Sequence, residues 1–109
     1  MLFLQFSPHG RARARQRAGW SRQALERMLE HVVFDGLDAT ECTGALHRYL
    51  ATLPQRKPDR FVRVYGEHIF VFGRESTPDV ATLVTVLHLP HPFRAVARRA
   101  REMRHFMVA

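Results

Sequence analysis

The sequence has little cysteine and no long hydrophobic run. Cys42 is the single cysteine among 109 residues, which excludes an intrachain disulfide and a zinc site made of several thiolates. The apolar opening at residues 2–6 runs directly into Ser7-Pro8 and is too short for a signal peptide or a membrane span. We therefore expect a cytoplasmic protein and disfavour membrane association, although a basic amphipathic C-terminal helix is also compatible with binding at a membrane surface.

Glycine-rich loops and metal-ligand spacings are also missing. No glycine-rich segment opens a predicted helix, so phosphate-loop and dinucleotide-binding signatures are absent. None of the seven histidines has a glutamate or cysteine partner at ligand spacing, and the closest pair, His88 and His91, is interrupted by Pro90. We expect no cofactor and no metal.

Lysine is nearly absent, and acidic residues are unevenly distributed. Lys57 is the one lysine among 17 basic residues, and the formal net charge is +7. Residues 1–22 hold five arginines and no acid, and residues 94–109 hold five arginines and one acid, whereas residues 23–93 are mildly acidic. Because the guanidinium fork matches phosphate oxygens in pairs, we expect a polyanionic partner. The alternative is that the arginines reflect a GC-rich genome and are merely solvated.

Ordinary globular composition, with 46% hydrophobic and 25% charged residues, predicts one domain over residues 1–109. Ser7 and Pro8 start a basic helix that ends near Gly19. Ser21 starts a second helix that ends at Asp35-Gly36, and a third begins at residues 38–40 and ends before Pro54. Residues 91–109 form a basic helical extension, and if it packs on the sheet, its core residues are Val96, Ala97, Ala100 and Met103.

Alternating residues predict strands in the second half of the chain. Phe61 to Tyr65 and His68 to Phe72 form a hairpin around Gly66-Glu67, residues 80–89 form a long third strand, and residues 2–6 add a fourth. We predict an α+β fold in which N-terminal helices cover one face of a small antiparallel sheet of three to four strands. The other face is expected to be open and cationic, with these candidate residues on it: Arg63, Tyr65, Thr85 and His88.

The segment from Ser7 to Ser21 resembles the start of a family of small bacterial domains. Those domains open with Ser or Thr, x, His-Ala-Arg, x, Arg and continue into Arg-Gly-Ile-Ser and a helix. The matching residues here are His9, Arg11, Arg13, Arg17 and Ser21. Gly10 stands where the family has alanine, one residue is inserted near Ala18, and residues 83–86 resemble the family's terminal strand. The family is grouped with the RelE-like, barnase, EndoU and colicin ribonuclease toxins, and the resemblance covers residues 7–36 and 61–89.

This resemblance implies a metal-independent endoribonuclease toxin of a toxin–antitoxin or toxin–immunity pair, which cleaves RNA by attack of a 2′-hydroxyl on the phosphodiester. The implied partners are RNA and an acidic antitoxin or immunity protein. His9 is the first candidate for the acid or base, and Arg13 and Arg63 are the candidates for stabilising the phosphorane. Second-rank candidates are Tyr65, His68, Thr85 and His88. Candidates for RNA contacts are Arg11, Arg15, Arg17, Arg94, Arg98 and Arg101.

Two alternatives remain at the level of sequence. A non-catalytic nucleic-acid-binding accessory or regulatory protein would use the same arginines for phosphate contacts alone. The strand aromatics are expected mostly in the core, although on an exposed sheet they would stack unpaired bases.

Overall fold

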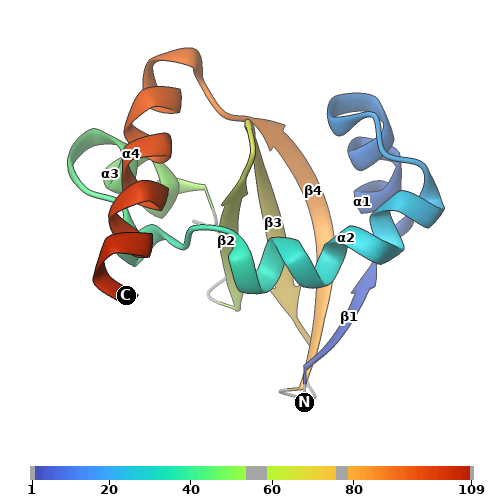
Figure 1. The fold of residues 1–109 in the computed structure, drawn as a ribbon. Coiled ribbons are helices and arrows are strands. Elements are labelled where there is room, and N and C mark those ends of the chain that lie inside the picture. Colours follow the sequence, from blue (N-terminus) through green and yellow to red (C-terminus); the bar gives the residue numbers. More distant parts are fainter. Residues whose placement is uncertain (1, 54–58, 76–78, 109) are drawn as a thin grey trace.

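The computed structural model describes residues 2–53, 59–75 and 79–108, without the side chains of residues 105–108. The elements, in chain order, are β1 (Phe3–Phe6), α1 (Pro8–Arg13), the π-helical turn η1 (Ala14–Ala18), α2 (Arg22–Asp35), the 3-10 turn η2 (Ala39–Glu41), α3 (Gly44–Thr52), β2 (Arg60–Tyr65), β3 (His68–Arg74), β4 (Val80–His88) and α4 (His91–Val108). The predicted α+β class and the C-terminal helix are confirmed (Figure 1).

The four strands form one sheet in the order β1-β4-β3-β2. β2 and β3 make the predicted hairpin, in which Gly66 has a φ of +61°, a left-handed conformation that favours glycine. β3 pairs antiparallel with β4 as expected. The predicted fourth strand is β1, but it pairs parallel with β4, with Phe3 opposite Val80, so the sheet is mixed rather than antiparallel throughout.

Helices pack on both faces of the sheet, so the expectation of one open face is wrong. On one face α2 packs against β3 and β4, and the buried residues there include Leu25, Leu29, Val32, Phe70, Phe72 and Val86. On the other face α3 and α4 pack against β2 and β3, and the buried residues include Leu46, Leu50, Val62, Ile69, Val71 and Ala97. The physical reason is the sequence of β3, in which residues 69–72 are all apolar and buried, so both faces need cover.

Both predicted serine caps start their helices. Ser7 Oγ accepts a hydrogen bond from Gly10 N–H at 2.9 Å, and Ser21 Oγ accepts one from Ala24 N–H at 3.2 Å. The basic helix predicted to end near Gly19 is α1 continued by η1, and Gly19 follows it with a φ of +73°. α1 lies along β4 just beyond the end of β1, as Figure 1 shows.

The third predicted helix is divided into two parts. Asp38 accepts backbone hydrogen bonds from Thr40 and Glu41, and Glu41 accepts one from Asp38 N–H, which is a capping box around η2. α3 begins afterwards, at Gly44. Cys42 lies buried between the two, in the packing role predicted for it.

α4 has part of its predicted core face. Ala97 is buried and Ala100 packs partly against the same cluster, whereas Val96 and Met103 are exposed, contrary to the expectation for them. Of the helices that the structure describes, none has the length and apolar character needed to cross a membrane.

Candidate nucleic-acid interface

The N-terminal basic segment, which we define as Arg11, Arg13 and Arg15 of α1 and η1, lies at the surface. Arg11 and Arg15 are exposed. Arg13 donates from Nε to His9 Nε2 at 3.4 Å and from Nη1 to Gln16 Oε1 at 3.0 Å. His9 and Arg13 therefore lie side by side, as their spacing of four residues on a helix requires. The segment presents cations to solvent next to an imidazole.

Arg17 holds η1 to the sheet. Its Nη1 donates to the Val86 carbonyl at 2.7 Å, and its own carbonyl lies 2.8 Å from His68 Nε2. Because a carbonyl only accepts, His68 carries its proton on Nε2, and in the neutral ring Nδ1 keeps a lone pair. Arg17, predicted as an RNA contact, is thus engaged with backbone, and it fixes the orientation of His68.

The strand-end group, which we define as Tyr65, His68 and His88, crosses three neighbouring strands. Tyr65 is opposite His68 in the hairpin, and His68 is opposite His88 in the next ladder. Directly opposite residues share a face of the sheet. The two imidazole centroids are 5.2 Å apart, and His88 is exposed while His68 and Tyr65 are half-buried. Trp20 borders the group, with its ring centroid 6.5 Å from that of Tyr65.

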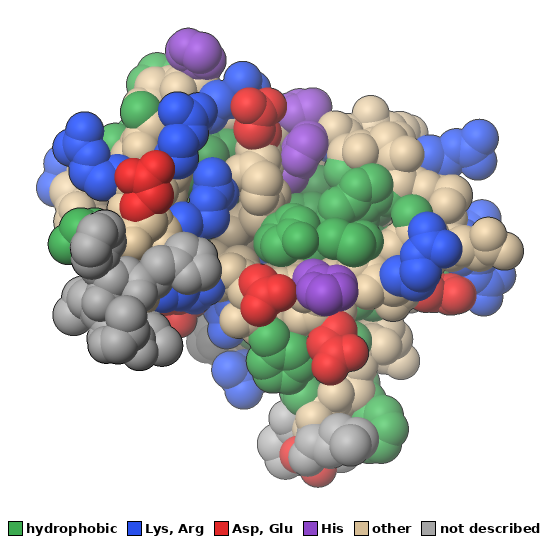
Figure 2. Space-filling view, viewed as in Figure 1, with side chains coloured by type: hydrophobic (Ala, Val, Ile, Leu, Met, Phe, Trp, Pro, Cys, Tyr) green, Lys and Arg blue, Asp and Glu red, His purple; other side chains and the backbone are tan. Residues whose placement is uncertain are grey.

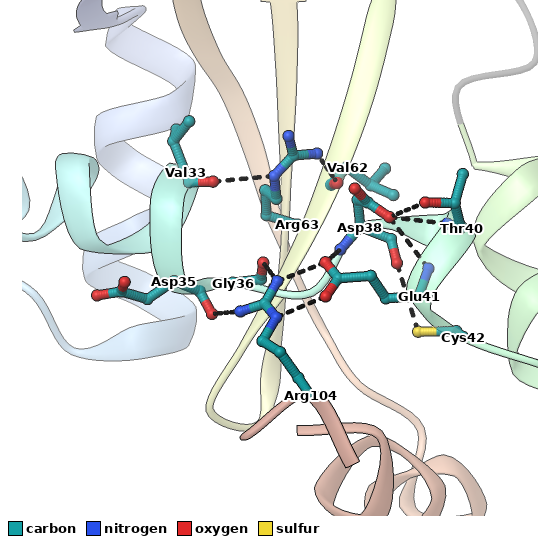
Figure 3. Close-up of polar contacts among 10 residues, drawn as sticks. All are labelled: Val33, Asp35, Gly36, Asp38, Thr40, Glu41, Cys42, Val62, Arg63 and Arg104. Atoms are coloured by element: carbon teal, nitrogen blue, oxygen red, sulfur yellow. Dashed lines mark hydrogen bonds and ion pairs between the residues drawn. The ribbon is translucent and has the colours of Figure 1, made fainter. Parts of the chain in front are cut away.

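Two of the predicted catalytic residues lie elsewhere. Thr85 is opposite Val71, which belongs to the core under α3 and α4, so Thr85 faces away from the strand-end group. Arg63 shares the face of Tyr65, but its Nε donates to the Val33 carbonyl at 3.0 Å and its Nη1 to the Val62 carbonyl at 2.9 Å (Figure 3). Burial lowers the pKa of the Arg63 guanidinium, and Asp38 acts against this shift. Arg63 is engaged at the end of α2.

His9 and Arg13 also lie apart from the strand-end group. Arg17, which contacts His68, follows His9 by eight residues, a separation of about 12 Å along a helix. The predicted catalytic set is therefore distributed over α1, the end of α2, the strand-end group and the opposite sheet face.

A second basic surface borders the strand-end group. Arg94, Arg98 and Arg101 recur at spacings of four and three, so they share one face of α4. Arg94 Nη1 lies 3.5 Å from Glu67 Oε2, and Arg101 Nη1 donates to the Gly66 carbonyl at 3.3 Å. α4 thus lies beside the β2–β3 turn. Figure 2 shows histidines next to a hydrophobic patch in the middle of this view, with arginines toward both flanks.

The strand aromatics divide between core and surface. Phe70 and Phe72 are fully buried, as expected, whereas Phe61 and Tyr65 are partly exposed. Trp20 was missed by sequence reasoning because it belongs to no periodic pattern. The pairing of Tyr65 with His68 could be predicted from the sequence, because these two residues flank the two-residue turn at Gly66-Glu67.

In the part of the chain that the structure describes, no three or more side chains of histidine, cysteine, aspartate or glutamate converge as a metal site would require. Comparison with protein-family models, with curated proteins and with solved structures found no match to this chain.

Proposed function

We propose that this protein is an endoribonuclease that needs no metal and that cleaves RNA at the strand-end group. The observation that carries the proposal is the His68–His88 pair, with ring centroids 5.2 Å apart. Cleavage by a ribose 2′-hydroxyl needs a base for that hydroxyl and an acid for the departing 5′-oxygen. Imidazole is suited to both roles, because it gains and loses protons near neutral pH.

The contacts of the two rings suggest which takes each role. His68 has Nε2–H bound to the Arg17 carbonyl, so its Nδ1 lone pair accepts the proton of the 2′-hydroxyl. His88, which is exposed, in its protonated form donates a proton to the 5′-oxygen. The 2′-oxygen forms a bond to phosphorus while the bond to the 5′-oxygen breaks, which leaves a 2′,3′-cyclic phosphate and a 5′-hydroxyl. Tyr65, which is opposite His68 in the hairpin, supplies a hydroxyl donor for the phosphorane oxygens.

The two basic helices supply affinity for RNA. The N-terminal basic segment on one flank and Arg94, Arg98 and Arg101 on the other neutralise phosphates before and after the reacting one. His9 and Arg13 move in this proposal from catalysis to phosphate binding. The resemblance of residues 7–36 and 61–89 to ribonuclease toxins supports a role as the toxin of a toxin–antitoxin or toxin–immunity pair, with an acidic inhibitor as partner.

A non-catalytic nucleic-acid-binding protein is the second candidate. The observation that favours it is the exposure of Arg11, Arg15 and Arg98, which would contact phosphates without any help from the imidazoles. In that case, substitution of His68 or His88 would change local packing but not RNA binding.

Incubation of the purified protein with total RNA in the presence of EDTA separates the two functions. We expect cleavage to 2′,3′-cyclic ends, and a loss of about 100-fold or more in rate for His88→Gln, with RNA affinity retained. The matched control is His31→Gln, an exposed histidine on α2, which should cleave normally. Loss of cleavage in His9→Ala and Arg13→Ala but not in His88→Gln would place the reaction on α1 instead. RNA binding without cleavage by the wild type would favour the second candidate.

A further inference from the structure

β1 leaves one side of its backbone without a partner strand among the described residues. Phe3 N–H donates to the Asp79 carbonyl at 2.6 Å and Ser7 N–H donates to the Leu83 carbonyl at 3.0 Å. Alternate residues of a strand point their peptide groups to opposite sides. The N–H and C=O groups of Leu4 and Phe6 therefore point away from β4, at the edge of the sheet seen in Figure 1.

An apolar groove lies beside this edge. Phe3 and Phe34 are 63% and 60% exposed, and both line a groove of about 610 Å³ between β1 and α2. The other lining residues are Leu2, Leu4, Phe6, Glu26, Leu29 and Glu30. Edge strands usually carry charges that prevent association, but residues 1–6 have none. The edge and its groove are suited to another strand.

We propose that β1 pairs with β1 of a second copy of this chain. The pairing is antiparallel about a twofold axis at Gln5, so that Leu4 of each copy lies opposite Phe6 of the other. All the outward N–H and C=O groups of Leu4 and Phe6 are then hydrogen-bonded. A twofold axis normal to the sheet keeps both α2 helices on the same face, so the two grooves adjoin and enclose the phenyl rings of Phe34.

Charge and area favour a second copy as the occupant. The groove is lined by no basic residue, and of its two glutamates Glu26 is already paired with Arg22 at 3.2 Å, so two molecules of net charge +7 can approach here without arginines facing arginines. A buried phenylalanine covers about 150–250 Å², so the exposed parts of Phe3 and Phe34 in two copies supply roughly 400–600 Å². The strand edges with Leu2, Leu4 and Phe6, which are partly buried already, add to this area, and the total stays below the ~1,200 Å² of standard specific interfaces. A weak, concentration-dependent dimer is expected.

A cysteine at the twofold axis tests the register. Directly opposite residues of a non-hydrogen-bonded antiparallel pair have Cα atoms about 4.5 Å apart, within the range that a disulfide spans. We expect Gln5→Cys to form covalent dimers under mild oxidation at least about tenfold faster than Gln16→Cys, an exposed position on η1. The wild type is a second control, because Cys42 is buried. Equal rates for the two variants would overturn the proposed register.

Sedimentation at increasing protein concentration tests the interface itself. The wild type should shift from monomer to dimer, and Phe3→Lys and Phe34→Lys should each weaken the dimer at least about tenfold, since each replaces an apolar ring at the contact with a charged group. Met103→Lys makes the same change at a position 55% exposed on α4 and should have no effect. Either of two results would overturn the proposal: a protein that stays monomeric at all concentrations, or a dimer whose affinity is unchanged by Phe3→Lys. The first result would favour a strand of another protein as the partner of the β1 edge.

Discussion

Gly10 is where α1 approaches β4 most closely. A Cβ atom at this position would lie 2.2 Å from the Leu83 carbonyl oxygen, far inside contact distance. The ribonuclease-toxin pattern has alanine here, and this chain departs from it. The close approach of α1 to β4 explains this difference, because only glycine leaves room for the backbone of the strand.

We therefore expect Gly10→Ala to lower the free energy of unfolding by about 1–3 kcal/mol, as other overpacked sites do. Urea denaturation monitored by circular dichroism measures this change. Ala12→Gly, at an exposed position on the same helix, is the control and should cost no more than about 1 kcal/mol. If Gly10→Ala were as stable as the wild type, α1 would have to lie farther from β4 than it does here.

Cys42 is a packing residue whose thiol has low reactivity. Burial and the nearby Glu41 and Asp38 carboxylates raise the pKa of its thiol to about 11. The native state therefore holds the thiol proton more tightly than the unfolded state, whose pKa is about 8.5. The stability that this proton contributes is complete below about pH 8.5 and is lost as pH rises toward 11.

At pH 8 we expect iodoacetamide to modify Cys42 at least about 100-fold more slowly in the folded protein than in urea, because the thiolate is scarce and covered. Mass spectrometry of timed samples measures both rates. Similar rates in the two conditions would mean that the segment between η2 and α3 opens readily.

At the scale of elements, the C-terminal end of α2 is held by arginines from distant parts of the chain. α2 has no basic residue in its last turn. Arg63 of β2 donates to the Val33 carbonyl, and Arg104 of α4 donates to the carbonyls of Asp35 and Gly36 at 2.7 and 3.0 Å (Figure 3). These cations satisfy the free carbonyls and oppose the negative end of the helix dipole.

Arg104 also joins two more elements. Its guanidinium forms hydrogen bonds with both carboxylate oxygens of Glu41, so α4, η2 and the end of α2 meet at one side chain. The hydrogen bonds that Arg104 donates to Glu41 raise the pKa of Arg104 above its ordinary value. Arg104 is therefore the main polar link between α4 and the rest of the fold among the described side chains.

We expect Arg104→Met, which keeps the apolar stem, to lower the free energy of unfolding by about 1.5–3 kcal/mol, because Glu41 and two carbonyls lose a charged donor. Arg22→Met is the control, since it breaks only the exposed pair with Glu26 and should cost no more than about 0.5 kcal/mol. Thermal and urea unfolding measure both variants. Equal stability of the two variants would contradict the role given to Arg104.

At the scale of the whole molecule, the two basic ends of the sequence lie on helices that flank the sheet, whereas the middle holds nine acidic residues, of which four form ion pairs among the described residues: Glu26, Asp35, Glu41 and Glu67. Because phosphate contacts release counterions, RNA affinity should fall steeply with salt. The double variant Arg11→Gln, Arg15→Gln should flatten the log–log slope by about 1.4, as expected for two lost contacts with a single strand.

Fluorescence anisotropy with a single-stranded RNA over a salt series measures the slopes. Arg22→Gln is the matched control, because Arg22 already pairs with Glu26. An affinity that does not depend on salt would show that nucleic acid is not the partner. An unchanged slope in the double variant would show that the arginines of α4, not those of the N-terminal basic segment, contact the phosphates.

The sequence alone determined most of the elements and their order, because helix caps, apolar periods and the Gly66 turn act over a few residues, although it did not show the division of the third helix into η2 and α3. Thr85 and His88 are three residues apart, so strand alternation already separates their faces. Only the tertiary structure decided which side chains meet. The His68–His88 pair depends on the β3–β4 register, which shifts at Val71/Phe72. The roles of Arg17, Arg63 and Arg104 depend on distant carbonyls, because a guanidinium can bind either phosphate or a backbone carbonyl and packing determines which one it meets.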